Sequence, residues 1–100
     1  MEKFDLALKE KAEKDLKGML DSARLPVRPS YSPGEVRIIL GISEREFHHL
    51  VNSYEVNPQN GLPRHPCSLD SFRLRNHRRV RYGELVDFLR RNNTLERNCV

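Results

Sequence analysis

The sequence predicts a mainly α-helical fold with one small β-hairpin. Three observations favour this class. Residues 32–52 hold two helix starts of the same design around a Gly-Ile-Ser turn, residues 2–23 carry apolar side chains at helical spacing, and residues 72–82 alternate apolar and basic side chains. A chain of 100 residues has room for one small domain with a modest core, so we expect one domain with an appended helix.

The first predicted element is an amphipathic helix within residues 1–24. Its apolar side chains stand three or four positions apart in a narrow stripe of Phe4, Leu8, Ala12, Leu16, Met19 and Leu20. Such a stripe needs a surface to pack on, either the rest of its own chain or the same helix of a second copy, which would give a homodimer through residues 2–23. Residues 25–30 contain two prolines and are predicted to be a short connector.

Residues 32–52 are predicted to form two helices joined by a tight turn. Each helix begins with a capping box, in which a serine hydroxyl accepts a hydrogen bond from the backbone N–H three residues on, and a glutamate accepts one from the serine N–H. The two boxes are Ser32 with Glu35 and Ser43 with Glu46. Gly41 is suited to end the first helix in the left-handed conformation, because it has no Cβ. The segment is therefore a candidate helix-turn-helix.

The apolar residues of this segment fall on inward positions and would form the core: Val36, Ile39, Leu40, Ile42, Phe47, Leu50 and Val51. The outward set on the second helix is Glu44, Arg45, His48, His49 and Asn52. A helix in the major groove of DNA presents such residues to base edges, where Arg can bond guanine and Asn can bond adenine. An ordinary solvated helix face is the alternative. The two glutamates of the first turn favour it because carboxylates repel phosphate, although Glu46 is expected to be held by its cap.

A loop and then a basic hairpin are predicted next. Residues 55–71 contain three prolines and one glycine and are predicted to be loop. The hairpin is predicted to turn at Asn76-His77, with an apolar face of Phe72, Leu74, Val80 and Tyr82 and a basic face of Arg73, Arg75, Arg79 and Arg81. Arg78 adds a fifth arginine, and residues 72–82 hold no acidic residue. Solvated surfaces usually mix charges of both signs, so this cluster favours a phosphate-binding surface.

Positive charge is concentrated near the C-terminal end. Residues 71–100 hold eight Lys or Arg against three Asp or Glu, whereas residues 31–70 hold three against five. Such a local excess is expected of a surface that binds a polyanion. A last helix is predicted from Gly83 or Glu84 to about Asn92, so the compact domain would span residues 31–92. Residues 93–100 have no periodic pattern and are predicted to be a flexible tail.

Other chemistries find little support in the sequence. His65-Pro-Cys67 with His48, His49 and His77 matches none of the zinc-finger or zinc-ribbon spacings, so no metal is expected. There is no Gly-rich phosphate loop, nucleophile elbow or carboxylate pair in an apolar setting, so we expect no enzyme and no cofactor, and no small-molecule ligand is evident. Cys67 and Cys99 are too few for a disulfide framework, and no apolar run suits a membrane span or a signal peptide, so a cytoplasmic protein is expected.

The order helix, turn, helix, loop, basic hairpin, helix resembles the excisionase-like and MerR-like winged helix-turn-helix domains. The resemblance covers about residues 31–91 and rests on Tyr31-Ser-Pro-Gly-Glu-Val36, Leu40-Gly-Ile-Ser43, Gly61-Leu-Pro63, Arg78-Arg79-Val80-Arg81-Tyr82 and Glu84-Leu-Val-Asp-Phe-Leu89. It implies a winged helix-turn-helix preceded by an N-terminal helix, with the second helix in the major groove and the hairpin, or wing, on the flanking backbone or minor groove. The implied DNA-binding residues are Arg45, His48, His49 and Asn52 on the helix, and Arg73, Arg75, His77, Arg78, Arg79 and Arg81 on the wing.

These features predict a protein that binds double-stranded DNA, either a transcriptional regulator or a recombination accessory factor, and that is nucleoid-associated when bound. The loop between Tyr54 and Phe72 is longer than the family pattern, and the second helix is less basic. Most of the affinity is therefore expected from the wing, with strong salt dependence and modest discrimination between sequences. The alternative is a protein-binding adaptor that keeps the winged fold and docks a partner through the N-terminal helix and the long loop.

Overall fold

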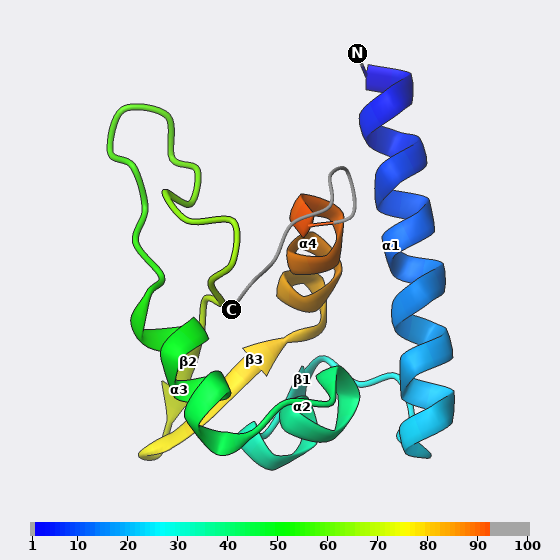
Figure 1. Ribbon diagram of the computed structural model, residues 1–100, viewed down its shortest axis with the longest axis vertical. Coiled ribbons are helices and arrows are strands. Elements are labelled where there is room, and N and C mark those ends of the chain that lie inside the picture. Colours follow the sequence, from blue (N-terminus) through cyan, green and yellow to red (C-terminus); the bar gives the residue numbers. More distant parts are fainter. Residues whose placement is uncertain (1, 93–100) are drawn as a thin grey trace.

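The computed structural model describes residues 2–92, which form four helices and three short strands (Figure 1). In chain order these are α1 (Glu2–Ala23), β1 (Ser30–Tyr31), α2 (Pro33–Leu40), α3 (Glu44–Asn52), β2 (Phe72–Leu74), β3 (His77–Arg81) and α4 (Tyr82–Asn92). The predicted class, mainly helical with a small antiparallel sheet, is confirmed. The predicted tail, residues 93–100, and with it Cys99, lies outside the described residues.

Helix α1 packs against α4 and α2, and its apolar stripe enters the core of its own chain. Ala12, Leu16 and Leu20 are fully buried there. They stand four positions apart and so lie on one face of the helix. Over this part of α1, the surface that the stripe needs is supplied within the chain. Figure 1 shows the N-terminal turns of α1 extending past the end of α4, and Leu6 in these turns is 56% exposed.

Helices α2 and α3 begin as predicted, and α2 ends as predicted. Ser32 Oγ accepts from the Glu35 N–H at 3.2 Å, and Glu35 Oε1 accepts from the Ser32 N–H at 2.9 Å. The box of Ser43 and Glu46 has corresponding distances of 3.1 and 3.0 Å. Gly41 has φ 68° and ψ 41°, a left-handed conformation that glycine adopts without strain. Both capping boxes and the turn between the helices are confirmed.

A three-stranded antiparallel sheet has the order β1-β3-β2. Strand β1 pairs Ser30 with Arg81 and Tyr31 with Val80, so the prediction of a plain connector is wrong at Ser30. A two-residue strand between prolines has no alternation from which it could be detected. Tyr31 is fully buried, and its hydroxyl donates to Pro26 O at 2.9 Å. The strand that precedes α2 is thereby fixed to the hairpin that follows α3.

The hairpin turns one residue earlier than predicted. Arg75 and Asn76 have φ of 53° and 70°, the left-handed pattern of a two-residue type I′ turn. The paired residues are Phe72 with Arg79, Arg73 with Arg78 and Leu74 with His77. Directly paired residues share a face, so the predicted split into an apolar and a basic face is wrong. One face holds Val80 with Arg73 and Arg78, and the other holds Phe72 and Leu74 with His77, Arg79 and Arg81.

Part of the predicted loop forms a projecting arm, which we define as residues 55–64. Val56 pairs with Pro63 in an isolated antiparallel bridge. The Asn57 N–H donates to Leu62 O at 2.8 Å, and the N–H of residue 64 donates to the carbonyl of residue 55 at 2.8 Å. Figure 1 shows the arm running from the C-terminal end of α3 away from the rest of the fold. The loop therefore has an internal structure that its composition does not indicate.

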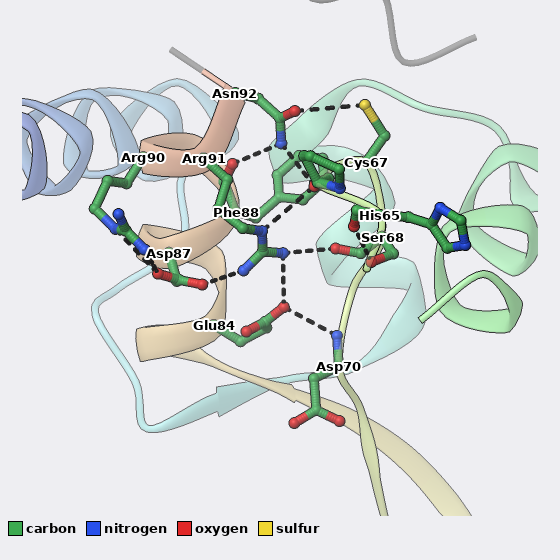
Figure 2. Close-up of polar contacts among 11 residues, drawn as sticks. His65, Cys67, Ser68, Asp70, Glu84, Asp87, Phe88, Arg90, Arg91 and Asn92 are labelled. Atoms are coloured by element: carbon green, nitrogen blue, oxygen red, sulfur yellow. Dashed lines mark hydrogen bonds and ion pairs between the residues drawn. The ribbon is translucent and has the colours of Figure 1, made fainter. Parts of the chain in front are cut away.

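The remainder of the loop returns to α4 through a network centred on Arg91 (Figure 2). The Arg91 guanidinium donates to Ser68 O at 2.7 Å and to Glu84 Oε2 at 3.1 Å, and it is also paired with Asp87. Glu84 Oε2 accepts in addition from the Asp70 N–H at 2.9 Å. Helix α4 thereby fixes the segment that leads into β2.

Candidate nucleic-acid interface

The outward set predicted for the second helix is exposed on α3. Arg45, His48, His49 and Asn52 are all exposed, while the opposite face of the helix buries three apolar side chains. At about 100° per residue, Arg45, His49 and Asn52 point furthest from that buried face. His48 lies to one side, where its Nε2 is 3.7 Å from Glu44 Oε1. The most outward residues are therefore one arginine, one histidine and one asparagine.

Two carboxylates flank Arg45 in the first turn of α3. Glu46 is held by the capping box, and its hydrogen bond from the Ser43 N–H lowers its pKa, so it is ionised at neutral pH. Glu44 is exposed beside His48. Helix α3 therefore offers a single full positive charge between two negative charges, which limits its attraction for phosphate.

The tip of the hairpin carries uncompensated positive charge. Arg73, Arg75 and His77 are exposed, and their side chains form no hydrogen bond or ion pair with the side chains of residues 6–92 or with the described backbone. Arg73 stands directly opposite Arg78 in the sheet, a like-charge arrangement that destabilises strand pairing. Arg75 lies in the left-handed region, which is uncommon for a residue other than glycine.

The other three hairpin arginines have partners inside the chain. Arg79 Nε donates to Ser30 Oγ at 3.1 Å, and a terminal nitrogen of the same guanidinium donates to Ser30 O at 3.0 Å, which ties β3 to β1. Arg78 donates to a serine hydroxyl just before β2. The Arg81 guanidinium lies 4.2 Å from the centroid of the Phe72 ring. These contacts hold the hairpin in shape, and Arg81 stays exposed.

Helix α3 and the hairpin lie on the same side of the molecule, away from α1 (Figure 1). The segment that enters β2 is attached to α3, because the buried Leu69 donates its N–H to Leu50 O at 3.0 Å. The structure thus brings both parts of the predicted site to one side of the fold. Leu74 at the tip is 60% exposed and pairs with His77. The sequence had predicted it on an apolar face of the hairpin and had not included it in the interface.

A cavity of about 550 Å³ opens beside the C-terminal half of α3, where His49, Asn52, Tyr54, Glu55 and His65 are among its lining residues. Among the side chains that the structure describes, those of residues 6–92, no three His, Cys, Asp or Glu are grouped so that they could hold a metal ion. None of the helices described is long and apolar enough to cross a membrane.

Comparisons with known proteins do not identify a family. No protein-family model, curated protein or solved structure matches this chain. The candidate interface therefore rests on the geometry of this chain alone.

Proposed function

We propose that this protein binds double-stranded DNA as a winged helix-turn-helix of the excisionase-like or MerR-like kind, acting as a transcriptional regulator or a recombination accessory factor. Helix α3 would enter the major groove, and the β2–β3 hairpin would be the wing on the flanking backbone or minor groove. The order of elements supports this proposal. A strand, two helices joined by a tight turn, and a hairpin that pairs back onto that strand follow one another along the chain.

The observation that carries the proposal is the cross-strand pair of Arg73 and Arg78. A sheet that places two arginines opposite each other loses stability, and within the described residues Arg73 has no carboxylate partner. The left-handed backbone of Arg75 lowers the stability of the hairpin further. Bound phosphate offsets the repulsion between the arginines, because its oxygens accept the paired N–H donors of a guanidinium.

The roles of helix and hairpin differ in this proposal. Phosphate contacts position a protein on DNA, whereas contacts to base edges select a sequence. Arg45 is the single Lys or Arg of α3, so the helix adds little to the overall attraction. We therefore assign most of the affinity to the hairpin tip, and any sequence preference to Arg45 and Asn52, whose side chains can bond guanine and adenine.

The test follows the fluorescence anisotropy of a labelled random-sequence duplex over a series of salt concentrations. The affinity of the wild type should fall steeply with salt, because binding releases counterions from the DNA. The double variant Arg73→Gln with Arg75→Gln should bind more weakly at low salt. Its slope of log affinity against log salt should be shallower by about 1.8, since each lost phosphate contact removes about 0.9.

A matched control removes two positive charges from the other side of the molecule. Lys14 and Lys17 are exposed on α1, away from the hairpin (Figure 1). The double variant Lys14→Gln with Lys17→Gln should keep the salt slope of the wild type. If the two double variants weaken binding equally, the hairpin tip is not the contact surface and only net charge matters.

The alternative, a protein-binding adaptor with the same fold, is favoured by the exposed apolar side chains of Val56 and Leu62 on the arm. If the protein is such an adaptor, it should have no measurable affinity for the duplex even at low salt. That result would overturn the DNA-binding proposal in favour of the adaptor.

A further inference from the structure

The arm, residues 55–64, holds apolar side chains in solvent on a structured support. Val56 is 43% exposed and Leu62 is 59% exposed. Val56 is opposite Pro63 and Asn57 is opposite Leu62, so the two exposed side chains point to opposite faces of the arm. At the tip, two backbone N–H groups each donate a hydrogen bond of 2.9 Å to the side-chain oxygen of an asparagine, which fixes the turn. An ordered arm with apolar groups on both faces suits a groove better than a flat surface.

The same chain contains an apolar groove of about 580 Å³. It is lined on α1 and α4 by Met19, Phe88 and Leu89, and on α2, the following turn and α3 by Leu40, Ile42 and Leu50. Four of these side chains are only partly buried against the core: Met19, Leu40, Ile42 and Leu89. A volume in the range of roughly 300–1,000 Å³ is typical of sites that enclose drug-sized groups, so the groove has room for a few side chains.

We propose that the arm of one copy docks in the groove of a second copy, so that the protein self-associates through arm-to-groove contacts. The arm and the groove are respectively the projecting and the recessed apolar features of one chain. Their charges are also complementary. The arm carries Glu55 and Arg64, 3.7 Å apart at its base, and the groove rim carries Arg45 and Glu46. Because Glu46 is engaged by its capping box, the charge pairing that the rim offers is between Glu55 of the arm and Arg45.

The arm does not fill the groove of its own chain. It leaves the fold at the C-terminal end of α3 and runs outward (Figure 1), whereas the groove lies beside Arg45 and Glu46 in the first turn of that helix.

The proposed interface differs from a dimer through the stripe of α1, because Ala12, Leu16 and Leu20 are buried within the chain. It does not depend on DNA binding. Apolar contacts persist at salt concentrations that abolish phosphate binding, so the two proposals fail separately.

The experiment measures sedimentation of the full chain from micromolar to millimolar concentration, without DNA and at high salt. The wild type should shift reversibly from monomer to a larger species. Leu62→Asp should raise the dissociation constant at least about tenfold, because it replaces a buried apolar contact with a charge. Val27→Asp is the matched control for Val56→Asp, since Val27 is 59% exposed but lies outside the arm and the groove. Val56→Asp should weaken association and Val27→Asp should not.

A mixing experiment identifies the partner surface. Met19→Glu places a charge in the groove and should also weaken association. A mixture of Leu62→Asp and Met19→Glu should associate, because an intact arm from one variant can dock in an intact groove of the other. Arm-to-arm pairing predicts instead that Met19→Glu alone associates like the wild type and that Leu62→Asp does not join it. If Met19→Glu does not fold, hydrogen exchange of the wild type distinguishes arm-to-groove contacts from arm-to-arm contacts. Residues 40–46 and 56–63 should both gain protection with concentration under the proposal.

Three results would overturn the inference. They are a wild type that stays monomeric at millimolar concentration, a Leu62→Asp variant that associates like the wild type, and concentration-dependent protection of the arm without protection of the groove. The last result would indicate pairing between arms, and the first would indicate that the arm binds a different protein.

Discussion

Arginines occur in two opposite settings in this protein. The Arg91 side chain is 9% exposed and its guanidinium is shared among Glu84, Asp87 and backbone carbonyls (Figure 2). The arginines at the hairpin tip are exposed, and the side chains of Arg73 and Arg75 have no partner among the described side chains of residues 6–92. A buried guanidinium whose donors are satisfied is part of the fold. The positive charge of an exposed guanidinium that faces another arginine adds nothing to the stability of the fold, and this sets Arg73 apart from Arg91 in the same sequence.

The largest expected effect is at Arg91. Arg91→Met leaves the carboxylates of Glu84 and Asp87 without their shared cation, and breaking a buried ion pair from one side costs about 3–5 kcal/mol. We expect a loss of this size in the free energy of unfolding, measured by urea titration with circular dichroism. Arg90→Met is the control, because Arg90 also bonds Asp87 but is 29% exposed. It should cost about 1 kcal/mol or less. Equal losses in the two variants would mean that the Arg91 network is no more than a surface pair.

A smaller effect is expected at Arg79, a hairpin arginine with internal partners. Arg79→Met removes two hydrogen bonds to Ser30 and so loosens β1 from β3. Hydrogen bonds from charged groups contribute about 1.5–3 kcal/mol, and we expect a loss of stability in that range in the same urea titration. Ser30→Ala should cost less, because the backbone acceptor remains. If Arg79→Met is as stable as the wild type but binds DNA weakly, Arg79 would instead contact DNA like the arginines at the hairpin tip.

Local signals predicted the helices well because their causes are local. The capping box of Ser43 with Glu46 and the left-handed Gly41 involve residues within four positions of each other, and the structure has both. The hairpin was predicted, but its turn was not placed correctly. Arg75 and Asn76 lack the Asn-Gly or Asp-Gly signature of a type I′ turn, and a shift of one residue inverts the faces of a strand.

Long-range features could not be predicted from the sequence. Strand β1 exists because Ser30 and Tyr31 meet residues about fifty positions further on. Arg91 falls within the last helix that the sequence predicts, but its hydrogen bond to Ser68 depends on where the loop returns. The predicted interface residues are exposed except for Arg78 and Arg79, which are only partly exposed. The hairpin arginines that bond within the chain could be identified only once the strand register was known.

A pH-dependent effect is expected in the Arg91 network. Burial raises the pKa of Glu84 above its usual 4.5, although the Asp70 N–H and Arg91 act in the opposite direction. Between 4.5 and the raised pKa, the folded protein holds a proton that the unfolded chain releases, so stability falls as pH rises through this window. Glu84→Gln removes the titration. The difference in free energy of unfolding between wild type and variant should change there by at most about 1.4 kcal/mol per pH unit.

Asp87 provides the contrast for this measurement. Burial raises its pKa, but the hydrogen bonds and charges of Arg90 and Arg91 outweigh burial and lower the pKa below its usual 3.8. Its contribution is therefore present above 3.8 and is lost as pH falls through the lowered pKa. Urea titrations at pH values above 4.5 follow Glu84 with Asp87 ionised throughout. A difference between wild type and Glu84→Gln that is constant over this range would show that Glu84 is as well solvated in the fold as in the unfolded chain.

The smallest expected effect on stability, at Arg73, is the most informative about function. Arg73→Gln relieves the repulsion from Arg78 across the strands, so the free energy of unfolding should stay the same or rise by up to about 0.5 kcal/mol. Duplex affinity should fall in the same variant. Lys17→Gln on α1 removes the same charge without a facing arginine and should change neither quantity appreciably. A clear loss of stability in Arg73→Gln would give Arg73 a structural role like that of Arg91. A gain in stability combined with a loss of duplex affinity is expected only if the positive charge of Arg73 binds a polyanion.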